Sequence, residues 1–209
     1  MKPIIFARIA DMKYYKGITE NDKPVNGGSY VKDTNDAHEC YNFDPVQLND
    51  GKEYCLGFSM LMGGNNPQLH IEKIVGCETL KNAEFADDVT VVFCSKPHNG
   101  KSMRIVGFYR HARVYRDYQI CIFPGNNNDD YEQYYNFIAE KKNCILLPYQ
   151  ERFRTGEWFV PTSGKMGYSF GFGHSNIWYA GSNTSDTKEI EYVNELLNSI
   201  ETYAGDNLV

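Results

Sequence analysis

The chain has 209 residues, of which 42% are hydrophobic and 23% charged, so a packed core is expected and wholesale disorder is excluded. Its formal net charge of −6 argues against nonspecific wrapping of nucleic acid. No apolar run approaches the roughly 18–20 residues that span a membrane, and Arg8 and Asp11 interrupt the N-terminal apolar stretch. We therefore expect a cytoplasmic protein with no signal peptide and no membrane partner.

Runs rich in β-branched and aromatic residues predict that most regular elements are strands. In chain order we expect strands at 4–9, 53–60, 69–74, 89–94, 103–109, 112–118, 144–147 and 158–160, with 103–118 forming two strands or one bent strand. The segment 11–51 holds many turn formers, and its aromatic residues need packing partners, so it is expected to be an ordered loop region.

Two segments predict helices. Asp130 and Gln133 have the spacing of a capping box, and an apolar-aromatic face follows over 131–138. A second helix is expected at about 186–204, with Asp186 at its start and an apolar stripe along it. Strands outnumber helices and no βαβ rhythm occurs. The expected fold is therefore one α+β domain over 1–209, with a mixed or antiparallel sheet curled toward a barrel, a central helix and a C-terminal helix.

The six cysteines stand far apart and form no CxxC pair. A structural zinc site usually needs two close pairs, and a reducing compartment keeps thiols from forming a disulfide framework. We expect the cysteines to be small buried hydrophobes and no metal to be bound. Walker A, dinucleotide-binding and GxSxG motifs are also missing from the sequence, so no cofactor is expected.

A basic and aromatic run extends from Lys96 to Arg116, with six Lys or Arg and no Asp or Glu. Arginine suits phosphate through its two-pronged guanidinium, and aromatic rings provide stacking planes for bases. The candidate phosphate-binding residues are Arg104, Arg110, Arg113 and Arg116. The alternative is a solvated strand whose arginines pair with the acidic remainder of the chain.

A second constellation combines aromatic side chains with glycines over 158–179 and contains both tryptophans of the chain. Glycine lets a backbone approach a ligand closely, several rings can hold a flat base, and an amide can read a base edge. Its members are Trp158, Phe170, Phe172, His174, Asn176, Trp178 and Tyr179. The alternative is a small aromatic core beneath a loop.

Two motifs that contain acidic residues are catalytic candidates. His38-Glu39 lacks the second histidine of the HExxH pattern, because position 42 is Asn, so the pair is an acid/base couple or a structural hydrogen bond. Asp87-Asp88 could bind magnesium, but a turn before the following apolar strand is the simpler explanation.

Several segments resemble a largely uncharacterised bacterial domain found in the N-terminal part of HNH-type and other restriction-like defence proteins. They are residues 5–9, 12–15, 27–30, 38–43, 105–116 and 174–180, and their order and spacing extend over nearly the whole chain, including the final helix. That family is similar in organisation to the PUA-like readers of modified bases, such as EVE and SRA domains. Asp11 and Phe108 stand where the family pattern has tryptophan, so a stacking plane is missing or replaced. No HNH motif is visible, so cleavage would need a partner nuclease domain or subunit.

The leading hypothesis is a DNA-recognition module for modified or marked bases in a restriction or defence setting. The arginines named above would bind phosphate, and the residues expected to contact the base are Tyr14, His38, Tyr109, Trp158, His174, Asn176 and Trp178. Extruding a base costs a few kcal/mol, which stacking at ~1–3 kcal/mol per aromatic plane could offset. The alternatives are a metal-dependent nuclease or nucleotide hydrolase using His38, Glu39 and Asp87 or Asp88, and a domain that binds a small ligand or a protein.

Overall fold

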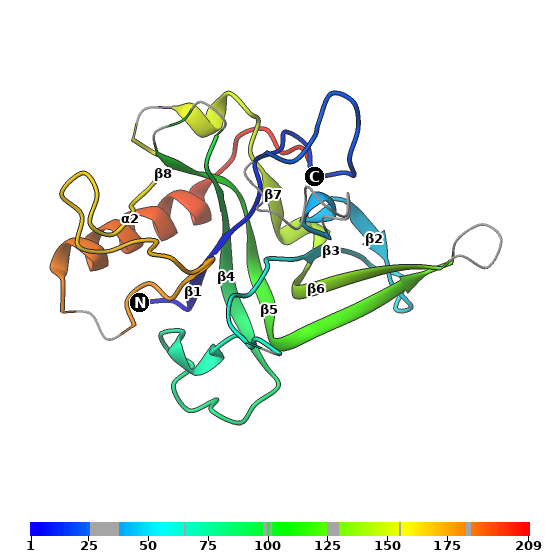
Figure 1. Ribbon diagram of the computed structural model, residues 1–209, viewed down its shortest axis with the longest axis horizontal. Helices are drawn as coiled ribbons and strands as arrows, with labels where there is room; N and C mark the ends of the chain where they lie inside the picture. Colours follow the sequence, from blue (N-terminus) through cyan, green and yellow to red (C-terminus); the bar gives the residue numbers. More distant parts are fainter. Residues whose placement is uncertain are drawn as a thin grey trace.

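The computed structural model describes residues 1–25, 38–64, 66–97, 100, 102–124, 130–154, 156–182 and 185–209. Over these residues the protein is a mixed α+β fold, mostly sheet, with a C-terminal helix (Figure 1). The strands are β1 (Ile4–Arg8), β2 (Pro45–Gln47), β3 (Glu53–Gly57), β4 (Phe85–Ser95), β5 (Met103–Phe123), β6 (Tyr131–Glu140), β7 (Cys144–Leu146), β8 (Phe159–Val160) and β9 (Ile177–Trp178). The helix is α2 (Thr187–Thr202), and short 3-10 turns include η1 (His38–Tyr41), η2 (Ile71–Lys73), η4 (Lys141–Asn143) and η5 (Glu151–Phe153).

The sheet is organised around β5, whose 21 residues pair with four other strands. The strand β4 lies along one side of it, and β8, β7 and β6 follow one another along the other side. The main path runs β2-β3-β6-β5-β4-β1-β9, and only the β1–β4 pair is parallel among the strand pairs described. The end strands β2 and β9 do not pair with each other in this path, so the sheet is not closed. The sequence had led us to expect a sheet curled toward a barrel.

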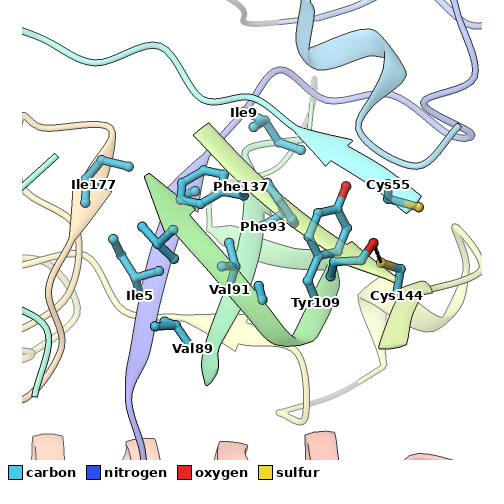
Figure 2. Close-up of a cluster of buried hydrophobic side chains, with 14 of the residues drawn as sticks. Ile5, Ile9, Cys55, Val89, Val91, Phe93, Tyr109, Phe137, Cys144 and Ile177 are labelled. Carbon is cyan, nitrogen blue, oxygen red and sulfur yellow. Dashed lines mark hydrogen bonds between the residues drawn. The ribbon is translucent and has the colours of Figure 1, made fainter. Parts of the chain in front are cut away.

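Two hydrophobic cores lie on the two faces of this sheet. Successive residues of β1 alternate between them: Ile5 and Ala7 enter the first core, and Ile4 and Phe6 enter the second. The first core includes Val91, Phe93, Tyr109 and Phe137 (Figure 2). The helix α2 covers the second core. The residues of its buried face are Val193, Leu196, Leu197 and Ile200.

The C-terminal helix predicted from its apolar stripe and from Asp186 is present as α2. Asp186 is the N-cap, and its side chain accepts a hydrogen bond from the backbone N–H of Lys188. The strands expected at the N-terminus, in 53–60, in 89–94, along 103–118, in 144–147 and in 158–160 are also present, with shifted ends. The segment 103–118 is part of one continuous strand, β5.

Two element predictions were wrong. The segment 131–138, predicted to be the central helix, lies in strand β6, which pairs with β5 and β3. Its aromatic and β-branched residues favour a strand, and a stripe at helical spacing in so short a segment does not distinguish the two states. The segment 69–74, predicted to be a strand, contains the 3-10 turn η2 instead.

At Gly107, β5 lies very close to its neighbours. A Cβ atom built there would lie 2.3 Å from the carbonyl oxygen of Ile145 and 2.7 Å from the ring of Phe43. We expect Gly107→Ala to lower the free energy of unfolding by about 1–3 kcal/mol, measured by urea denaturation, because a packed backbone must shift. The control is Gly173→Ala, whose Cβ would meet no atom within 4 Å. Equal stability of the two variants would contradict this account of the packing.

The cysteines and the helix bear on two further expectations. All six cysteines are free, five of them are buried, and Cys121 is partly exposed. In the described ranges, no helix combines the length and the apolar character needed to cross a bilayer.

Candidate functional site

The aromatic residues expected to stack on a base lie mainly in the cores. Tyr109 is fully buried, and its hydroxyl donates a hydrogen bond to the backbone carbonyl of Asn42. Trp158 is 1% exposed and lies in the second core beside Phe108 and Tyr203. Trp178 stacks on Phe6 with ring centroids 4.3 Å apart. These three rings therefore present no free face to a ligand, and the alternative reading, an aromatic core, describes them.

The arginines in the middle of the basic run are bound within the protein. Arg113 makes two hydrogen bonds to the carboxylate of Asp87, at 2.7 and 3.0 Å, and its guanidinium lies 3.8 Å from the ring centroid of Phe85. Arg116 donates to Glu72 and to backbone carbonyls, among them those of Ala83 and Leu80 at 2.9 Å. Both arginines hold local structure, as expected if this strand pairs with the acidic remainder of the chain.

The remaining members of the basic run do not gather with these two. The guanidinium of Arg104 lies 5.5 Å from the ring centroid of Phe159, beside β8. Arg110 is half-buried, and its charge acts on the Cys144 thiol, whose pKa is raised by burial despite this. Lys101 lies outside the described residues, as do residues 27–30 of the family resemblance.

The residues proposed for a nuclease are also apart in their contacts. Glu39 is buried and accepts a hydrogen bond from the backbone N–H of Ala10, whereas Asp87 binds Arg113 and Asp88 binds His111. The side chains of Asp88 and His111 are mostly exposed. His38 packs on Phe58 and Tyr134. Within the part of the chain that the structure describes, no group of three His, Cys, Asp or Glu side chains is arranged to hold a metal ion.

The most unusual polar environment lies at the carboxyl end of β1, around Arg8. This half-buried guanidinium donates one hydrogen bond, 3.0 Å long, to the carbonyl of Gly173, and lies 4.9 Å from the ring centroid of Phe172. The Nε–H of Arg8 is buried and has no hydrogen-bond partner among the described residues. Nor does any described carboxylate pair with it, and burial lowers its pKa, with the Cys94 thiol acting in the opposite direction.

Two of the predicted base contacts adjoin Arg8 through the backbone. The N–H of Arg8 donates to the carbonyl of Asn176, and the side-chain amide of Asn176 donates to the carbonyl of Met60. His174 follows Gly173 and is exposed. The structure thus places Asn176 and His174 near β1, although the amide N–H group of Asn176 already has a protein partner.

Two buried side chains, Asp22 and Arg152, fix the backbone that follows β1. The carboxylate of Asp22 accepts from the N–H groups of Lys13 and Tyr14, at 2.7 and 2.8 Å. The buried guanidinium of Arg152 donates to the carbonyls of Met12 and Lys13, both at 2.6 Å. Tyr14 itself, whose backbone is fixed in this way, is 52% exposed. An exposed ring on a backbone fixed in this way is pre-organised for contact with a ligand.

Buried acids complete this region. Asp11 accepts from the hydroxyl of Ser95 at 2.6 Å and from that of Tyr149 at 3.4 Å. Glu39 is 7% exposed, and burial raises its pKa to about 7, against the opposing effect of the Ala10 N–H. We call Arg8, His174 and Asn176, which the backbone contacts of Arg8 bring together, the β1-end site, and Tyr14 follows six residues further along the chain.

Sequence reasoning missed Arg8. The signal available was the motif 5–9, in which a cation ends an otherwise apolar strand, but the sequence does not show which arginines lack a carboxylate partner. Comparisons of the chain with protein-family models, with curated proteins and with solved structures found no match.

Proposed function

We propose that the chain is a nucleic-acid-binding module in which Arg8 contacts a backbone phosphate. One observation carries this proposal: Arg8 is half-buried without an anionic partner among the described residues, and its Nε–H is unsatisfied. A buried donor without a hydrogen-bond partner costs about 1–3 kcal/mol of stability, and a hydrogen bond to a phosphate oxygen would remove this cost.

The other arginines provide the contrast. Arg113 has Asp87, Arg116 has Glu72 and several carbonyls, and Arg152 has three backbone carbonyls. A phosphate binding to any of these would have to displace a protein acceptor, whereas Arg8 offers a free donor. Among these four, Arg8 is therefore the arginine best suited to an external anion.

We assign base stacking to Tyr14, and not to the buried rings of Tyr109, Trp158 and Trp178, because the Tyr14 ring is exposed and its backbone is fixed. Tyrosine stacks on bases without strong sequence preference, and each such plane is worth about 1–3 kcal/mol. His174 follows Gly173, which accepts from Arg8, and is exposed, so it is a candidate polar contact.

The finer proposal is that the bound strand is DNA carrying a modified base, in a restriction or defence setting and with a separate nuclease partner. It rests on the sequence resemblance, and the PUA-like fold type is proposed on the same basis. The hydrolase alternative has less support, because Glu39, Asp87 and Asp88 have separate partners. A small anionic ligand such as a nucleotide remains the competing occupant of the β1-end site.

Fluorescence anisotropy with labelled oligonucleotides tests the proposal. Single-stranded and duplex DNA, each with plain cytosine or 5-methylcytosine, would be titrated at two salt concentrations. We expect Arg8→Ala to weaken binding at least roughly tenfold and to reduce the salt dependence by about one phosphate contact, because a charged hydrogen bond is worth ~1.5–3 kcal/mol. Arg8→Lys should recover only part of the affinity, since lysine lacks the Nε–H donor.

The matched controls are Arg154→Ala and Arg113→Ala. Arg154 is exposed and pairs with Glu151, and Arg113 pairs with Asp87, so both variants should bind within about twofold of wild type. Circular dichroism checks that each variant is folded. A correctly folded Arg8→Ala protein with wild-type affinity, or a loss confined to Arg113→Ala, would overturn the assignment. Binding of mononucleotides as tight as that of oligonucleotides would favour the small-ligand alternative.

A further inference from the structure

Two adjacent β-bulges interrupt the pairing of β4 with β5. Strand β4 has one extra residue within 86–89, and β5 has one extra residue in the next step, within 109–112. Each bulge contains a residue with left-handed backbone, Asp88 with φ 59° and His111 with φ 52°. This conformation costs energy in a residue other than glycine, and both such strain and bulges are frequent at functional sites, where they redirect side chains. The paired bulges therefore mark this part of the sheet as a candidate binding region.

Polar contacts between the two bulges fix the side chains of β5. The Nδ1 atom of His111 lies 2.6 Å from a carboxylate oxygen of Asp88, and Arg113 makes its two hydrogen bonds to Asp87. An ionised carboxylate can only accept, so in the neutral imidazole Nδ1 carries the proton and Nε2 is an acceptor. The His111 side chain is 60% exposed, so a ligand can reach this acceptor.

A cavity of about 440 Å³ lies beside these bulges, and we call it the bulge cavity. His111 and Arg113 of β5 line it, together with Tyr54 of β3 and Asn143 of η4. Its volume is within the ~300–1,000 Å³ of small-molecule sites. None of its lining residues belongs to the β1-end site, so the two regions can bind different ligands.

The lining of the bulge cavity favours an uncharged ligand. Its three carboxylates, Asp50, Asp87 and Glu140, already accept hydrogen bonds from other side chains. A small cation would compete with those donors, and a small anion would meet three negative groups. A ligand with several hydroxyl groups avoids both costs, because each hydroxyl can donate and accept. Asn143 can also do both through its amide, and His111 can accept.

Two aromatic rings add apolar surface that is already fixed in place. The Tyr54 hydroxyl donates to Asp50 at 2.6 Å. The Tyr115 ring packs with its centroid 6.0 Å from that of Phe85 and 5.8 Å from that of Tyr135. Rings held in this way can contact the C–H groups of a ligand with little further loss of conformational freedom. The cavity thus offers flat apolar surfaces beside polar groups, which suits a ring that carries hydroxyl groups.

We infer that the bulge cavity binds an uncharged ring with adjacent hydroxyl groups, either a saccharide or the ribose of a nucleoside. His111 Nε2 accepts a proton from one hydroxyl, the amide of Asn143 contacts a second, and the tyrosine rings pack against the carbon skeleton. This binding activity goes beyond the phosphate contact proposed for Arg8 and does not depend on it.

NMR titration tests the inference through the signals of the His111 ring and the Asn143 amide. The probes are methyl glucoside, methyl riboside and uridine. We expect saturable shifts with a Kd in the millimolar range, as suits so small a ligand. His111→Asn removes Nε2 while keeping a residue type that tolerates left-handed backbone, and Asn143→Ala removes the amide; each should weaken binding roughly fivefold. Tighter binding of uridine than of either glycoside identifies a nucleoside as the ligand, and the reverse order identifies a saccharide.

His70→Asn is the matched control, because His70 also places Nδ1 beside a carboxylate, that of Glu72 at 3.0 Å, and lies outside the bulge cavity. It should bind the probes as wild type does, and so should Arg8→Ala. Circular dichroism checks that each variant is folded. The inference is overturned if no uncharged probe gives saturable shifts, or if folded His111→Asn and Asn143→Ala keep wild-type affinity. Tighter binding of inorganic phosphate or ethylammonium than of every uncharged probe would also overturn it, and none of these results would change the Arg8 effect on oligonucleotides.

Discussion

Arg152→Ala is expected to lower the free energy of unfolding by about 3–5 kcal/mol, the cost of removing one partner from a buried charged network. Arg152 is 1% exposed, and its guanidinium donates to the carbonyls of Leu147, Met12 and Lys13. It also lies 5.3 Å from the ring centroid of Tyr149. The substitution would leave three carbonyls without this donor and leave Asp11 without the nearby positive charge. Urea denaturation followed by circular dichroism measures the change.

Arg154→Ala is the matched control, because Arg154 lies two residues further on, is exposed and pairs with Glu151. Its stability should stay within about 0.5 kcal/mol of wild type. If both substitutions cost the same, the network beneath residues 12–14 would not have the structural role assigned to it. A folded Arg152→Ala protein should also bind oligonucleotides less tightly, since Tyr14 would lose its fixed position.

Trp158→Ala should have a comparable effect, about 3–5 kcal/mol, because a large ring would be removed from a closed core. Its ring lies with centroids 6.2 Å from Phe108 and 5.8 Å from Tyr203, so it joins the sheet to the chain after α2. The midpoint of urea unfolding gives the loss. The control is Met166→Ala, whose side chain is 74% exposed and should contribute little.

This prediction separates the two readings of the aromatic segment 158–179. A ring that stacks on an extruded base would contribute to affinity and little to stability, and Trp158→Ala would then fold normally and bind poorly. A core ring gives the opposite pattern, with a large loss of stability. Wild-type stability of Trp158→Ala would show that the core assignment is wrong.

Local pattern was sufficient for most strands and for α2. Val89 to Cys94 is an apolar, β-branched run, and Asp186 has the chemistry of an N-cap, so both elements could be recognised without tertiary information. Tyr131 to Ile138 could not, because its apolar spacing fits a helix while its residue types fit a strand. The pairing of β6 with β5 and with the distant strand β3 decided between them, and a local window of sequence does not contain the β3 partner.

The candidate site shows the same limit for charges. The sequence alone does not distinguish Arg8 from Arg113 and Arg116, because all three lie in or at the end of apolar strands. What distinguishes them is the position of Asp87 and Glu72, which the fold brings to the first two but not to the third. Of the expected base contacts, Tyr14 is exposed, whereas Tyr109 and the tryptophans fill the cores.

The surroundings of Arg8 come from every part of the chain. Gly173, which accepts from its guanidinium, is 165 residues away in sequence, and Ser59, whose hydroxyl donates to its carbonyl, is 51 residues away. The parallel partner of β1 is β4, reached only after most of the first half of the protein has been placed. Contacts of such high sequence separation require the closure of long loops, and they cannot form in a fragment that lacks one of the partners. A ligand held there would consequently bind only the completely assembled chain and would raise its melting temperature as a whole.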